Sequence, residues 1–149
     1  MNEEPDPGSH DGVSGRIDRA AAALGRVAPA DDVLRVGLGV VILAAGLHKL
    51  VAPDDWGVYL APLFADRWPV SVEWTMVAFG VSELPFGLAL IAGYYTTLAA
   101  AVVAVSMLGT LVDLGILWVQ TGAGAAVAVR DLSVFVLAVG VTVRSATAE

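Results

Sequence analysis

Five ionisable residues lie within or at the rims of the long apolar stretches of this chain, and their types are suited to chemistry. They are Lys49, Glu83, Asp113, Arg130 and Asp131. A charge at the centre of a membrane helix costs about 2.5–3.5 kcal/mol on insertion scales, so such a residue usually faces the interior of a helix bundle and finds a partner there. We therefore expect a buried polar cluster. If that cluster is functional, it would bind a polar head such as a quinone ring or pass protons, with Glu83 as the group that exchanges protons.

The composition excludes other kinds of reactive centre. The chain has no cysteine, which rules out disulfides, thiolate-bound metals, iron–sulfur clusters and thiol redox couples. One of its two histidines, His10, lies in the polar N-terminal region, so a haem held between two membrane histidines of one chain is excluded. We expect no metal site, and no cofactor other than a quinone or a lipid. His48 is expected at the membrane interface and not as a ligand.

Four helices must position the cluster, because the apolar stretches have the length of membrane spans. They cover roughly residues 34–51, 72–92, 96–119 and 125–143, each near the ~20 residues that cross a hydrocarbon core of ~30 Å. Mean hydropathy is +0.75, and 15% of the residues are charged against about 25% in soluble proteins. The expected fold is all-α, a four-helix transmembrane bundle with a disordered acidic N-terminal tail. The expected boundaries are 1–32 for the tail, 33–144 for the membrane domain and 145–149 for a second tail.

Two segments outside the spans carry their own expectations. Residues 1–15 are rich in Asp, Glu, Pro, Gly and Ser, which predicts disorder, and the pattern from Ser14 to Arg26 predicts a short helix. That helix either rests on lipid headgroups or is a frayed alanine-rich segment. In the loop of residues 54–71, aromatic side chains predict anchoring at the membrane–water boundary, and residues 56–64 predict a short helix on or in the membrane surface.

Charge predicts orientation and surroundings. Lys and Arg near the span ends favour one side by five to three, which places both termini in the cytoplasm if the spans cross the plasma membrane. Net charge is −7 with a single lysine, a composition typical of a high-salt, haloarchaeal cytoplasm. Nothing basic enough to bind nucleic acid is present.

Helical spacing predicts which side chains converge. At about 100° per residue, Arg35 and Lys49 share one stripe of the first helix with two glycines. Glu83 and Asp113 have similar small neighbours, which allow close helix packing. The expected packing positions are Gly39, Gly46, Gly80, Gly87 and Gly109. We expect Lys49 to pair with Glu83, and Arg130 with Asp113.

Two interpretations of this cluster stay open. Buried ion pairs often do no more than specify how helices pack. The alternative is a polar pocket near the outer leaflet, with all five charged residues in the outer half of the bundle and Glu83 about 16 Å deep.

The residues also resemble a known family. Arg35-Val-Gly-Leu-Gly39, Ala45-Gly-Leu-His-Lys49-Leu with Pro53, and Val81-Ser-Glu83-Leu-Pro-Phe-Gly87 resemble the first two helices of the DoxX-like membrane proteins (DoxX/DoxD), over about Val33–Val143. The resemblance implies a four-helix bundle in the plasma membrane. Arg35, Gly46, Lys49 and Glu83 match the family's polar positions, and Arg130-Asp131 suits its fourth helix.

The resemblance implies architecture more closely than activity. Some members are subunits of a thiosulfate:quinone oxidoreductase, others associate with redox or stress-protection complexes, and many have no assigned activity. The favoured function is a small membrane subunit of quinone-linked or respiratory redox complexes; whether the chain is itself an enzyme stays open. The alternatives are a scaffold or assembly protein with purely structural charges, and a transporter or proton conduit, which is less expected because no inverted repeat is evident. Expected partners are the lipid bilayer, redox enzyme subunits and further copies of the chain.

Overall fold

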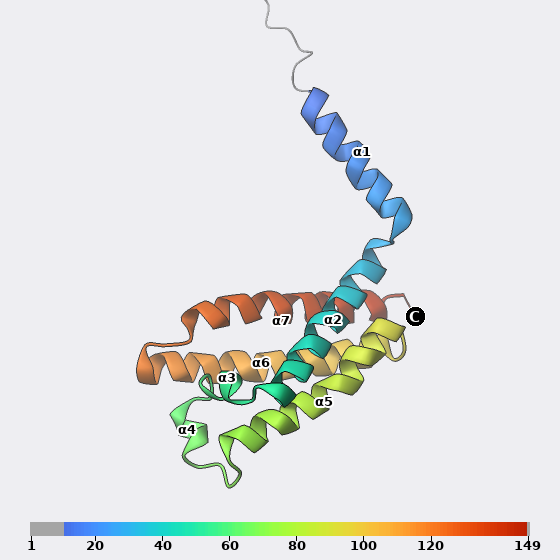
Figure 1. Cartoon of the computed structure of the whole chain (residues 1–149). Coiled ribbons are helices and arrows are strands. Elements are labelled where there is room, and N and C mark those ends of the chain that lie inside the picture. The colour runs from blue at the N-terminus through green and yellow to red at the C-terminus, as the bar shows by residue number, and fades with distance from the viewer. Residues whose placement is uncertain (1–10, 149) are drawn as a thin grey trace, which may run out of the picture. The chain divides into compact units, whose positions relative to one another are not determined.

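The computed structural model describes residues 11–148, and every regular element in this range is a helix (Figure 1). The helices are α1 (Asp11–Val27), α2 (Ala30–Val51), α3 (Asp54–Gly57), α4 (Pro62–Ala65), α5 (Val72–Ala92), α6 (Thr96–Thr121) and α7 (Ala125–Ala146). Four of them, α2, α5, α6 and α7, are long and apolar enough to cross a membrane. The all-α class and the four predicted spans are therefore confirmed.

The described chain divides into two units, one ending at Val33 and one beginning at Leu34. The first contains α1, which begins at Asp11, so residues 11–15 of the stretch expected to be disordered are helical. Arg19 Nε donates to the carbonyl of Gly15 at 2.8 Å, one turn back along the helix. Residues 1–10, the rest of the predicted disordered tail, lie outside the described residues.

Capping residues mark the start of α5 and the ends of α5 and α6. The Ser71 side chain accepts a hydrogen bond from the Trp74 amide, which caps the start of α5. Gly93, at φ 77°, ends α5 in the left-handed conformation that glycine adopts without strain. Gly122, at φ 76°, ends α6 in the same way.

Helices α2 and α5 pack backbone against backbone, which four of the predicted packing glycines make possible. A Cβ on Gly39 would lie 2.8 Å from the Gly87 carbonyl oxygen, and one on Gly80 would lie 2.8 Å from that of Gly46. Side chains larger than hydrogen at these positions would force the helices apart. Gly109 differs from this prediction, because within residues 11–148 no atom of another helix lies within 4 Å of its Cβ position.

The membrane helices run antiparallel to their chain neighbours, with α6 and α7 side by side and α5 against α6 (Figure 1). One apolar core cluster, which includes Leu38 and Leu90, joins α2, α5, α6 and α7. A second, around Ala61, Leu114 and Leu117, lies where α4 meets α6. The short helices contact the long ones, α3 against α5 and α4 against α6, at the end of the bundle where α2 ends and α5 begins.

Candidate functional site

Lys49 and Glu83 form a buried ion pair at the contact between α2 and α5. Lys49 Nζ donates to both carboxylate oxygens, at 2.6 and 2.7 Å, and the two side chains are 9% and 12% exposed. The glycine contact brings them together, since a Cβ on Gly46 would lie 3.2 Å from the Glu83 Cβ and one on Gly80 would lie 3.0 Å from the Lys49 Cβ. The structure thus contains the pair expected from helical spacing.

Trp56 of α3 covers this ion pair. The Lys49 Nζ atom lies 4.2 Å from the centre of the Trp56 ring, close enough for a cation–π interaction. The indole Nε1 donates to Nδ1 of His48 at 2.8 Å. The exposed His48 side chain therefore positions the Trp56 indole.

Asp113 holds the α3–α4 segment and does not pair with Arg130, which corrects the second expected ion pair. Its Oδ1 atom accepts a hydrogen bond from the Ala61 amide at 3.0 Å, at the start of α4. Helical spacing could not reveal this partner, because a backbone amide of a loop carries no side-chain signature. Within the part of the chain that the structure describes, Oδ2 of Asp113 accepts no hydrogen bond.

Arg130 pairs instead with its neighbour in the chain. Its Nε donates to Asp131 Oδ1 at 2.9 Å. Asp131 is buried, whereas the Arg130 side chain is 59% exposed. The terminal guanidinium nitrogens have no hydrogen-bond partner among residues 11–148.

Arg35, expected as a secondary member of the cluster, lies at the other end of the bundle. Its Nη1 donates to the carbonyls of Leu90 and Ile91, the latter at 3.0 Å, where α5 ends. Lys49 lies fourteen positions after Arg35 on the same helix, or about 21 Å along its axis. Arg35 therefore stabilises the last turn of α5 and contributes nothing to the charged cluster.

The five predicted charged residues line one cavity of about 430 Å³, together with aromatic and small polar side chains. The aromatic lining comes from the loop, its two short helices and α5, and the polar lining from α5 and α6. These further residues are Trp56, Tyr59, Phe64, Trp68, Phe79, Thr75, Ser106 and Thr110. The sequence predicts Trp56, Tyr59 and Trp68 as interfacial anchors and Phe64 only as the end of a short helix on or in the membrane surface. In the structure these four loop aromatics form a wall of the cavity.

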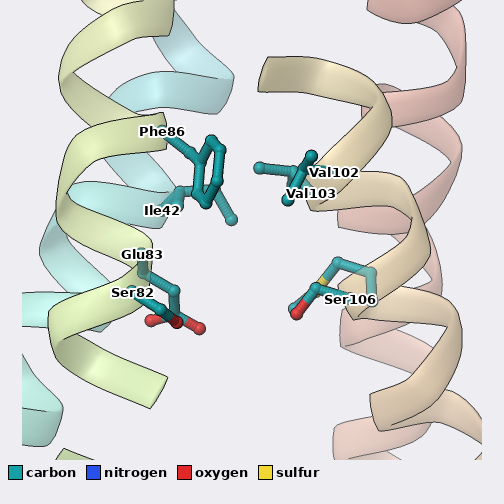
Figure 2. Close-up of a pocket in the computed structure, with 8 residues that line it drawn as sticks. Ile42, Ser82, Glu83, Phe86, Val102, Val103 and Ser106 are labelled. Carbon is teal, nitrogen blue, oxygen red and sulfur yellow. The ribbon is translucent and has the colours of Figure 1, made fainter. Parts of the chain in front are cut away.

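A second, smaller cavity of about 40 Å³ adjoins the first between α5 and α6 (Figure 2). It shares Glu83, Ser106 and Met107 with the large cavity. Phe86 of α5 and Val102 of α6 face each other across it, with Glu83 and Ser106 on the same two sides (Figure 2).

The charged side chains of the large cavity differ in whether they have a partner of opposite charge. The Lys49–Glu83 and Arg130–Asp131 pairs are neutral overall, whereas Asp113 has no cationic partner among residues 11–148 and accepts a hydrogen bond from a backbone amide. A ligand in the cavity would thus meet a carboxylate acceptor and guanidinium donors. Among residues 11–148, no three His, Cys, Asp or Glu side chains gather closely enough to hold a metal ion.

Comparison with known proteins supports the resemblance in the sequence. The family model of DoxX matches residues 30–121, which is more than half of the chain. The chain belongs to the DoxX family. Neither the curated proteins nor the solved structures give a match to it.

The DoxX match extends from α2 to the end of α6. It therefore includes Lys49, Glu83 and Asp113 with the covering loop, and stops before Arg130 and Asp131. The guanidinium side of the cavity is contributed by a helix beyond the matched region of the DoxX family.

Proposed function

We propose that this DoxX-family protein is a membrane subunit of a quinone-linked redox complex and that its large cavity binds the quinone head group. The observation that carries the proposal is the convergence of five charged residues and an aromatic wall on one cavity of about 430 Å³. Small-molecule sites usually have volumes of about 300–1,000 Å³, with an apolar lining and a few converging polar groups.

Two residues suit the recognition of a quinone head. The unpaired guanidinium nitrogens of Arg130 would donate to a quinone carbonyl oxygen, and the second carboxylate oxygen of Asp113 would accept from a quinol hydroxyl. The Trp56 and Tyr59 rings offer faces for stacking. Because the chain has no cysteine, any thiolate-bound electron carrier would belong to a partner subunit.

Tryptophan fluorescence tests this proposal directly. Trp56 and Trp68 line the cavity, whereas the other two tryptophans, Trp74 and Trp118, lie outside it and are exposed. In a Trp74→Phe/Trp118→Phe background, the remaining emission reports on the cavity. We expect a benzoquinone to quench it along a saturating curve, and Arg130→Gln to weaken that binding. Linear, non-saturating quenching would reject the proposed site.

A scaffold function is the second candidate, and the Lys49–Glu83 pair favours it. Both ends of this pair are satisfied within the chain, beside glycine contacts that close the α2–α5 interface. If the charges are structural only, Glu83→Gln lowers stability and abundance but leaves the activity of a purified complex intact. Loss of quinone binding in Arg130→Gln at unchanged stability would instead favour the redox subunit.

A further inference from the structure

The interface between α5 and α6 differs from the other contact that α5 makes. Against α2, the glycine positions leave no room even for a methyl group. Against α6, Gly109 borders the large cavity and faces open space, and the small cavity continues between the two helices. Helix α5 is therefore closed against α2, whereas its interface with α6 is open where the two cavities lie and closed where Leu90 packs in the apolar core.

The large cavity also reaches the lipid-facing surface along this interface. Phe79 of α5 and Val105 of α6 both line it, yet they are 50% and 72% exposed. In a membrane helix such exposed apolar side chains face acyl chains. The wall between α5 and α6 thus borders the hydrocarbon phase.

The charged side chains are concentrated in the large cavity, which all five line, whereas the small cavity shares only Glu83 with that group. Arg130 lies near the start of α7, Glu83 lies about 16 Å along α5, and Phe86 lies about 21 Å along it. Beyond the three residues that it shares with the large cavity, the small cavity is lined by one polar side chain and four apolar ones, which are Ser82, Ile42, Phe86, Val102 and Val103. This order, from charged groups near a membrane surface to apolar groups at depth, matches an amphiphile whose head is at the surface and whose tail points inward.

We infer that the α5–α6 interface is the path of a hydrocarbon tail, so that the ligand is a long-tailed membrane quinone that enters sideways from the bilayer. The inference rests on the proposed function, since it concerns the same cavity. The small cavity marks where the tail begins, with the flexible Met107 side chain moving aside to admit it. A water-soluble solute has no hydrocarbon tail to place in this opening and would not enter from the bilayer.

A side chain that fills the small cavity tests binding of the tail separately from binding of the head group. Val102 lines the small cavity and not the large one, so Val102→Phe obstructs the tail path alone. Val112→Phe is the matched control, because Val112 lies on the same helix, is 55% exposed and borders neither cavity. Both variants are made in the Trp74→Phe/Trp118→Phe background, in lipid nanodiscs. For each variant and its parent, the apparent Kd is measured for a tail-less benzoquinone and for an isoprenoid-tailed quinone. Because each quinone partitions into the lipid equally in both samples, the ratio of the two Kd values for one quinone is independent of partitioning.

We expect Val102→Phe to weaken binding of the tailed quinone at least tenfold and that of the tail-less quinone less than twofold, with Val112→Phe changing neither. If Val102→Phe is misfolded by circular dichroism, Val102→Met fills the same space with a flexible side chain and carries the same expectation. Equal effects on both quinones, or none on either, would overturn the tail path while leaving the head site in place. Failure of the parent to bind either quinone would instead reject the proposed function.

Discussion

At the residue scale, the Lys49–Glu83 pair matters for stability because removing either residue leaves the other as an unpaired buried charge. Glu83→Gln leaves a buried lysine ammonium without its counter-charge, and removing one partner of a buried pair costs about 3–5 kcal/mol. Replacing both residues, as Lys49→Met with Glu83→Leu, should recover most of that loss. Denaturant unfolding in detergent, analysed as a double-mutant cycle, measures the coupling. Additive effects would show that the pair does not lock α2 to α5.

Asp113 allows a finer test, because asparagine keeps the acceptor that aspartate uses. Asp113→Asn should retain the hydrogen bond from the Ala61 amide, whereas Asp113→Ala should leave this buried donor unsatisfied, at a cost of about 1–3 kcal/mol. Hydrogen exchange at the Ala61 amide should therefore stay slow in the first variant and become fast in the second. Fast exchange in the wild-type protein would contradict this anchoring of the α3–α4 segment.

At the scale of elements, glycine-to-alanine substitutions at two positions are expected to have opposite effects on stability. Gly80→Ala should destabilise the bundle by about 1–3 kcal/mol, because the new methyl group meets the Gly46 carbonyl at the α2–α5 contact. Gly109→Ala places the same methyl group in open space, and should be neutral or stabilising by up to about 1 kcal/mol. Thermal unfolding of both variants in one detergent provides the comparison. Equal destabilisation would mean that α5 and α6 pack as tightly as α5 and α2.

The elements also explain how far sequence could predict the site. Apolar length alone located the four spans, and glycine stripes on consecutive helices brought Lys49 to Glu83. The partner of Asp113 was beyond such reasoning, because it is a backbone amide whose position depends on how the loop folds. Arg130 pairs with the next residue, Asp131, a local contact that inter-helix geometry does not reveal. The loop aromatics predict only an interfacial position. Their composition is the same whether they face lipid or a cavity, so the sequence does not distinguish the two.

At the scale of the whole molecule, the charge distribution predicts how the protein lies in the membrane. With both termini in the cytoplasm, the α6–α7 turn lies outside. The chain has no cysteine, so a single introduced one is a clean reporter. A membrane-impermeant maleimide on intact cells should label Ala123→Cys in that turn and should label Ala148→Cys, near the C-terminus, only after lysis. The opposite pattern would reverse the orientation and place the charged cavity at the cytoplasmic leaflet.

Photoaffinity labelling tests most directly whether the charged cavity holds a quinone head, as we propose. An azidoquinone irradiated with the protein in native membranes should label peptides that carry the aromatic wall, residues 56–68, and the α6 face around Thr110. Excess unmodified quinone should abolish this labelling, and Arg130→Gln should reduce it. Labelling confined to lipid-facing positions such as Val129 and Val136, or unaffected by excess quinone, would contradict the account.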